Sequence, residues 1–79
     1  EATAASAEAR AAEAGTLAQQ IAEAQASVAL ARQTFARTSK LLKEGVITRA
    51  RYDNDAAALK AAEARLAGVS AERGAALRD

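Results

Sequence analysis

Few residues in this sequence could perform acid–base, nucleophilic or metal chemistry. It contains no histidine and no cysteine, so a base or nucleophile would have to be a carboxylate, lysine, tyrosine or serine. Asp53 and Asp55 are two apart and would point to different faces of a helix. The segment after Asp53 also lacks the glycine and later glutamate of a calcium loop. We expect both acids to favour a helix start or pair with nearby bases, and predict no enzyme activity, metal site or cofactor.

Basic residues cluster on both sides of one short segment. With Glu44 as the only acid among them, they are Arg37, Lys40, Lys43, Arg49 and Arg51. Two interpretations stay open: a solvated end of the molecule, or an electropositive end that meets carbonyls or acids of a partner. The formal net charge is only +1, so no strong field draws in nucleic acid or an anionic membrane.

The elements that must position this cluster are helical. Alanine supplies 26 of the 79 residues, there is no proline, and only four glycines and two aromatic residues occur. This composition favours long helices or a coiled coil and cannot fill a layered globular core. No apolar run is long enough for a transmembrane helix. Because no signal peptide or initiating methionine is visible, we expect a piece excised from a larger protein.

Two heptad patterns predict one all-α fold, an antiparallel two-helix coiled-coil hairpin over residues 1–79. Gly45 can end a helix in the left-handed conformation, and the Thr48 hydroxyl can cap the next one. We therefore expect helices over about 2–44 and 48–78, with a turn at about 45–47. The first seam is Leu17, Ile21, Ala24, Val28, Ala31, Phe35, Thr38 and Leu42, and the second is Tyr52, Asp55, Leu59, Ala62, Leu66, Val69, Arg73 and Ala76.

The two seams match when the chain folds back at the turn. Leu42 then faces Tyr52, Phe35 faces Leu59, and Val28 faces Leu66. In the same register Thr38 faces Asp55, and the one poor match is Arg73 opposite Ile21. Residues 1–14 have no partner within the chain, and we leave open whether they are solvated or pack on another chain.

A second stripe lies beside the first seam, formed by Leu30, Thr34, Arg37 and Leu41. It suggests a lateral contact with a neighbouring chain. The spacing Arg37-x3-Leu41-x6-Thr48 across the turn resembles the tip motif of HlyD-type periplasmic adaptors, or membrane fusion proteins, which carry serine where this chain has Thr48. The phrase around the turn and the alanine-rich second helix are also similar to the family, and the resemblance covers about residues 17–79.

This resemblance implies the α-hairpin of a periplasmic adaptor, anchored at the inner membrane in the full-length protein. In the family, six hairpins pack side by side, and their tips meet a TolC-like outer-membrane channel. Domains absent from this chain bind an inner-membrane transporter, and the tripartite pump performs efflux or secretion. Arg37, Leu41 and Thr48 would then contact the channel or the neighbouring hairpin.

Two other functions compete with this interpretation. A generic coiled-coil spacer would have no binding tip, so substituting Arg37 would change nothing. A nucleic-acid-binding coiled-coil arm would carry a basic track along its stem, but here basic and acidic residues alternate. We therefore expect protein partners and no nucleic acid.

Overall fold

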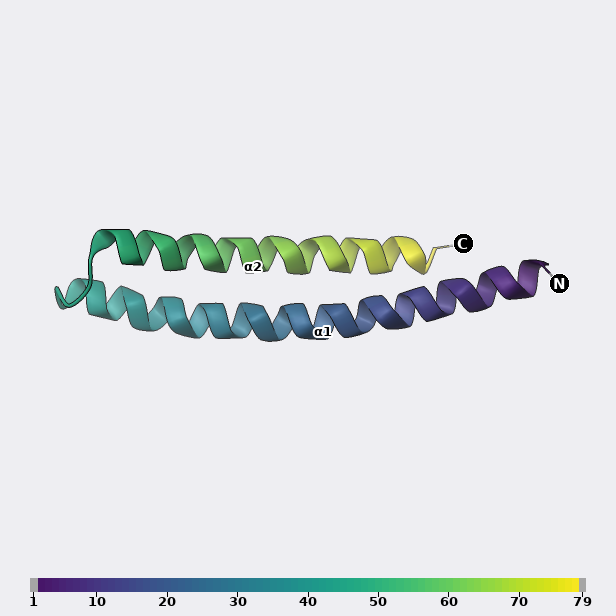
Figure 1. Ribbon diagram of the computed structural model, residues 1–79, viewed down its shortest axis with the longest axis horizontal. Helices are drawn as coiled ribbons and strands as arrows, with labels where there is room; N and C mark the ends of the chain where they lie inside the picture. Colours follow the sequence, from purple (N-terminus) through teal and green to yellow (C-terminus); the bar gives the residue numbers. More distant parts are fainter. Residues whose placement is uncertain (1, 79) are drawn as a thin grey trace.

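The computed structural model describes residues 2–78, with the side chains of 2–7 and 10 outside that description, and consists of two antiparallel helices (Figure 1). Helix α1 spans Ala2–Lys43 and α2 spans Arg49–Ala76. The predicted all-α hairpin is confirmed. The helices are slightly shorter than expected at the turn, because Glu44 already belongs to it and Thr48 is the cap of α2. At its other end α2 stops at Ala76, and Leu77 is its C-cap.

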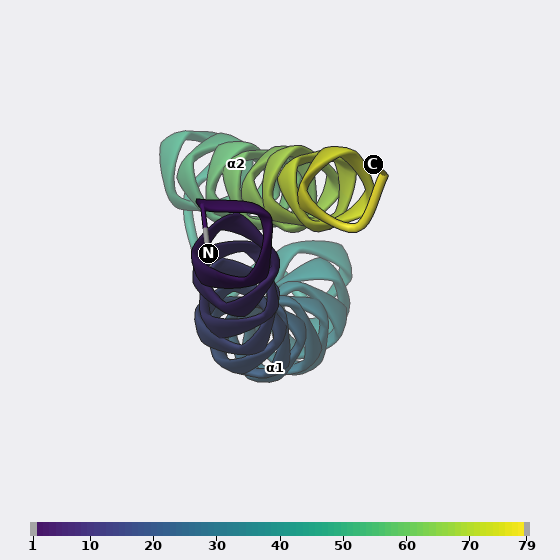
Figure 2. The same cartoon turned by 90° about the vertical axis from the view of Figure 1, so that its right-hand side faces the viewer.

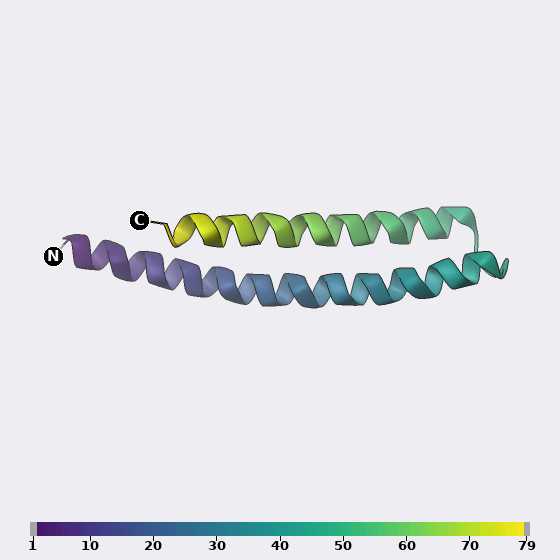
Figure 3. The same ribbon diagram turned by 180° about the vertical axis from the view of Figure 1, so that it is seen from behind.

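The hairpin is a thin rod that measures 65 × 14 × 12 Å. A helix of the length of α1 extends about 63 Å, so α1 alone sets the length of the rod. Both described ends of the chain lie at the end of the rod opposite the turn, with α1 running past the end of α2 (Figures 1 and 3). Viewed along the rod, one helix lies on the other, and α1 follows a curved path (Figure 2). Among the described residues, a core can therefore form at the interface between the two helices.

The turn follows directly from Gly45. Its φ of 75° is in the left-handed region that ends helices. Gly45 N–H donates to the Leu42 carbonyl at 3.0 Å, and Val46 N–H donates to the Leu41 carbonyl at 2.9 Å. This is the hydrogen-bond pattern of a Schellman motif, and it satisfies carbonyls at the end of α1 that lack partners within the helix.

The core is a narrow seam of mostly small side chains. In the described part of the chain the buried residues are Ala14, Leu17, Ala24, Val28, Val69 and the polar Thr38. Leu59 and Leu66 also lie on the seam, but they are only half-buried because no third layer covers them. Leu30, from the second stripe, is 64% exposed. The predicted division between seam and side stripe is therefore confirmed at these positions.

The pairing of the two helices begins earlier than expected from the sequence. Ala14 is only 6% exposed, although residues 1–14 were expected to lack a partner. Glu13 lines a shallow hollow together with Glu72, Ala75 and other residues at the end of α2. The end of α2 therefore covers α1 back to about residue 13, because a small side chain such as Ala14 lets the helices approach there.

Candidate partner-binding tip

The turn end of the hairpin carries all three residues singled out from the sequence. Arg37 and Leu41 are four residues apart on α1 and so share one face of it. Arg37 is exposed, whereas Leu41 is half-buried. Thr48 comes from the other side of the turn, immediately before α2. The fold thus places the three residues within the same end of the rod, on two different segments.

Thr48 performs a structural task. Its hydroxyl oxygen accepts a hydrogen bond from the backbone N–H of Arg51 at 3.1 Å. Its backbone is extended, with φ −81° and ψ 158°, and its carbonyl accepts from Tyr52 N–H at 3.2 Å. These are the features of an N-cap residue, as predicted. Because its hydroxyl oxygen accepts this bond, Thr48 fixes the geometry of the tip, while its O–H can still donate.

The basic residues that begin α2 are paired with acids. Arg49 Nε lies 3.1 Å from Asp53 Oδ1, and Arg51 Nε lies 3.4 Å from Asp55 Oδ2. Both pairs are four residues apart on the helix. Cations are unfavourable at the positive N-terminal end of a helix, and the neighbouring carboxylates offset them. The prediction that Asp53 and Asp55 pair with nearby bases is confirmed.

The basic residues of α1 are in a different situation. In the part of the chain that the structure describes, Arg37, Lys40 and Lys43 are exposed and form no ion pair. Lys40 and Lys43 lie in the last turn of α1, where cations complement the helix dipole. Arg37 lies nearly two turns from the helix end, beyond the reach of that effect. Arg37 is therefore a cation near the tip whose charge is not balanced by an ion pair with any described residue.

Contacts across the two helices hold the tip together. The Thr38 hydroxyl donates to Asp55 Oδ2 at 2.5 Å, which confirms that these two residues face each other. The rings of Phe35 and Tyr52 have centroids 5.2 Å apart and are tilted by 42°. Within α2, the Arg49 guanidinium lies 5.2 Å from the centre of the same Tyr52 ring. The sequence pattern placed Phe35 opposite Leu59 and missed this aromatic contact, because heptad positions do not show how far long side chains reach.

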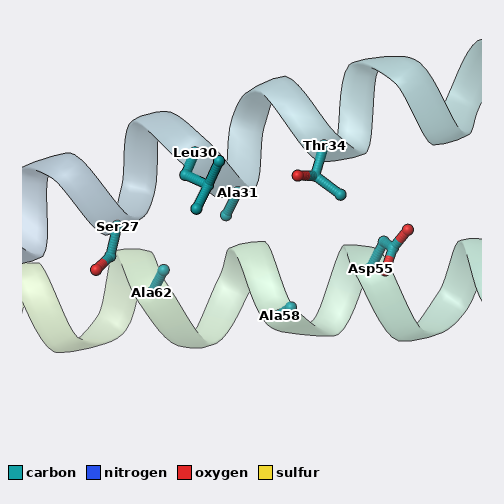
Figure 4. Close-up of a pocket in the computed structure, with 7 residues that line it drawn as sticks. All are labelled: Ser27, Leu30, Ala31, Thr34, Asp55, Ala58 and Ala62. Carbon is teal, nitrogen blue, oxygen red and sulfur yellow. The ribbon is translucent and has the colours of Figure 1, made fainter.

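A shallow groove of about 290 Å³ runs along one side of the hairpin (Figure 4). Leu30 and Thr34 of the second stripe lie on its α1 side, and alanines of α2 lie opposite (Figure 4). The alanine methyl groups leave the space that a larger side chain would fill. The full lining is Ser27, Leu30, Ala31, Thr34, Asp55, Ala58 and Ala62. The structure thus joins two members of the stripe in one groove, while Arg37 and Leu41 lie outside it, nearer the tip.

Val46 is a surface feature of the tip that the sequence reasoning did not single out. It is 66% exposed, although the residue after a Schellman glycine often packs back onto its helix. In the sequence, the one sign that Val46 lies at the tip was its position directly after Gly45. In residues 2–78 there is no group of acidic residues arranged to hold a metal ion, and neither helix has a stretch apolar enough to cross a bilayer.

Comparison with protein families decides the assignment. A family model described as "RND MFP, alpha-helical hairpin domain" matches residues 13–76. The chain belongs to this family of membrane fusion protein hairpins. No curated protein and no solved structure matches the chain. The matched range begins where α1 first lies beside α2 and ends at the last residue of α2.

Membrane fusion protein hairpins belong to periplasmic adaptors of RND-type pumps, so the domain has a structural adaptor role. Membership of the membrane fusion proteins is thereby confirmed at the level of the hairpin domain.

Proposed function

We propose that this membrane fusion protein hairpin docks through its tip onto a TolC-like outer-membrane channel. Its full-length protein would be a periplasmic adaptor, anchored at the inner membrane, that joins this channel to an RND-type transporter in a tripartite efflux or secretion pump. The spacing of Arg37, Leu41 and Thr48 is that of the HlyD-type tip motif, and we include that motif in the proposal. The adaptor role rests on the family match over residues 13–76.

The observation that carries the docking proposal is the state of Arg37. It is exposed near the tip and makes no ion pair with any described residue. A guanidinium group presents five donors in a rigid fork, which suits carbonyl oxygens at the exposed ends of a partner's helices. Leu41, half-buried on the same face, supplies apolar contact. Thr48 fixes the start of α2 through its cap.

Side-by-side association of hairpins, six in the full-length assembly, is the second part of the proposal. The exposed Leu30 beside the apolar groove is the surface that supports it. A lateral neighbour would cover Leu30 and complete a packing layer that a two-helix rod lacks. The transporter would be bound by other domains of the full-length protein.

The two alternatives fit the structure less well. A plain spacer gives no reason for an unpaired arginine on the same face as a half-buried leucine next to the turn. A nucleic-acid arm needs a continuous basic track, but acidic residues interrupt the stem, and one of them, Glu63, has its Oε2 atom 3.3 Å from Arg32 Nη2 across the helices.

Reversing the charge of Arg37 tests the docking proposal. We expect Arg37→Asp in the full-length adaptor to abolish export and cross-linking to the channel, because a carboxylate repels the partner's carbonyls. The free energy of unfolding should change by no more than about 0.5 kcal/mol, as is usual for surface substitutions. Export and cross-linking are measured in cells, and unfolding on the purified protein.

Arg65→Asp is the matched control, since Arg65 is also exposed but lies on the stem. It should export normally. Normal export by Arg37→Asp, or a defect shared equally by Arg65→Asp, would contradict docking through the tip and favour the spacer.

A further inference from the structure

We propose that Asp55 is a positioning residue of the tip. Its contact with Thr38 fixes the register of α2 along α1. That register in turn fixes where Thr48 lies relative to Arg37 and Leu41. The consequence for docking rests on the function proposed above, whereas the register itself is a property of the hairpin and is measured separately.

The contact is a polar one inside a seam whose other buried residues, in the described part of the chain, are apolar. Thr38 is 5% exposed and is the polar residue among the buried side chains of the described chain. The Asp55 side chain is only 14% exposed. Its Oδ2 atom accepts from the Thr38 hydroxyl at 2.5 Å and lies 3.4 Å from Arg51 Nε. A carboxylate so far withdrawn from water requires such partners.

The apolar residues of the seam do not choose the register by themselves. If α2 slid by one heptad towards the open end of the hairpin, Val28 would face Leu59 in place of Leu66. Leu17 would face Val69. Each helix would still present apolar or alanine side chains to the other along most of the seam, because both patterns repeat every seven residues.

The length of the connection does not forbid such a slip. The connection comprises residues 44–48, which can extend about 17 Å. One heptad of helix is about 10 Å long. The Schellman motif fixes where α1 ends and the Thr48 cap fixes where α2 begins. Since only Ile47 lies between these two motifs, a slip by one heptad would require one of them to open.

Asp55 and Thr38 remove this ambiguity. In the register slipped by one heptad towards the open end, Asp55 would face the methyl group of Ala31, without its hydroxyl donor. In the opposite slip, Thr38 would face Ala62. Both slips separate two buried polar groups that satisfy each other in the native register. Single buried polar residues specify register in coiled coils by this mechanism.

The register matters for the tip because the motif is divided between the helices. Arg37 directly precedes Thr38 on α1, and Thr48, the N-cap of α2, comes seven residues before Asp55. A slip by one heptad would move Thr48 by about 10 Å relative to Arg37. The three residues would then no longer form one surface.

Distances between spin labels test the register in the full-length protein, with any cysteine outside this segment replaced. Gln25→Cys and Ser70→Cys provide exposed attachment sites one heptad further from the tip than the Arg32–Glu63 pair. With the native residues at 38 and 55, we expect one narrow distance distribution. The combination Thr38→Val with Asp55→Leu should keep the helices but add a second population with α2 displaced by about 10 Å.

Two single variants keep the test decisive if the combination fails to fold. Thr38→Val preserves shape but removes the donor, so it should also broaden the distribution. Asp55→Asn should keep one narrow distance distribution, because the asparagine side-chain oxygen can still accept a hydrogen bond from the Thr38 hydroxyl. A single unchanged distance in Thr38→Val, or a broad distribution in Asp55→Asn, overturns the proposal.

The docking proposal can be disproved independently of the register proposal. Arg37→Asp should leave the label distance unchanged while abolishing export. If Arg37→Asp exports normally, docking is wrong but the register result stands. If Thr38→Val keeps one distance while Arg37→Asp abolishes export, docking stands and the register proposal is wrong.

Discussion

At the scale of single residues, Gly45 and Thr48 decide where one helix stops and the next begins. Gly45 adopts φ 75°, and a Cβ built there meets no atom within 4 Å. A side chain at this position would therefore cost free energy through the strained backbone conformation, and not through steric contact with neighbouring atoms. Gly68, in the exposed middle of α2, also has open space around its Cβ position.

These two glycines should respond to the same substitution with opposite signs. Gly45→Ala should destabilise the hairpin by about 1–2 kcal/mol, because an L-residue is strained in the left-handed conformation. Gly68→Ala should stabilise it by about 0.5–1 kcal/mol, because alanine loses less backbone entropy in a helix. Urea unfolding followed by circular dichroism measures both, and equal shifts would show that the turn does not depend on Gly45.

The residues of the turn were predictable because their effects are local. Glycine conformation and hydroxyl capping depend on a few neighbouring residues, so Gly45 and Thr48 could be assigned from the sequence. The Thr38–Asp55 pair could be predicted only as facing positions, since the hydrogen bond depends on side-chain geometry. The exposure of Val46 and the separation of the basic cluster into paired and unpaired groups required the fold.

At the scale of the elements, each helix is stabilised through one narrow face. Leu17 is 6% exposed, whereas Leu30 on the same helix is 64% exposed. The heptad pattern was sufficient to predict which face is buried. It did not predict how far pairing extends, because the contribution of small residues such as Ala14 depends on where α2 ends.

Truncating these two leucines measures the stabilisation from the seam. Leu17→Ala should cost about 2–3 kcal/mol, the lower part of the range for buried leucine, since only one layer surrounds it. Leu30→Ala should stay within about 0.5 kcal/mol when the hairpin is not associated with others. Thermal or urea unfolding provides both values. Similar losses for the two variants would mean that the assignment of the seam is wrong.

At the scale of the whole molecule, the hairpin is too thin to cover its own apolar side. Leu30 lies at the rim of a groove whose lining includes Ala58 and Ala62 of the other helix. The proposed lateral neighbour would remove this surface from water. The sequence indicated the stripe, but the groove exists only because small residues of α2 lie opposite it.

A charge introduced into this groove should weaken assembly without unfolding the hairpin. Leu30→Glu in the full-length adaptor should shift sedimentation towards the monomer, because a carboxylate would be buried against the neighbour. Gln25→Glu adds the same charge at another exposed position of α1 and should assemble normally. Unchanged assembly by Leu30→Glu would place the lateral contact elsewhere.

The rod is about five times longer than it is wide, and both described ends of the chain lie opposite the turn. It is therefore a lever. A rotation of a few degrees where the ends are held would carry Arg37 and Leu41 sideways by a distance comparable to a side chain. A small tilt at the base therefore produces a large sideways displacement of the tip. The precision of the angle at the base limits how accurately the tip can be positioned.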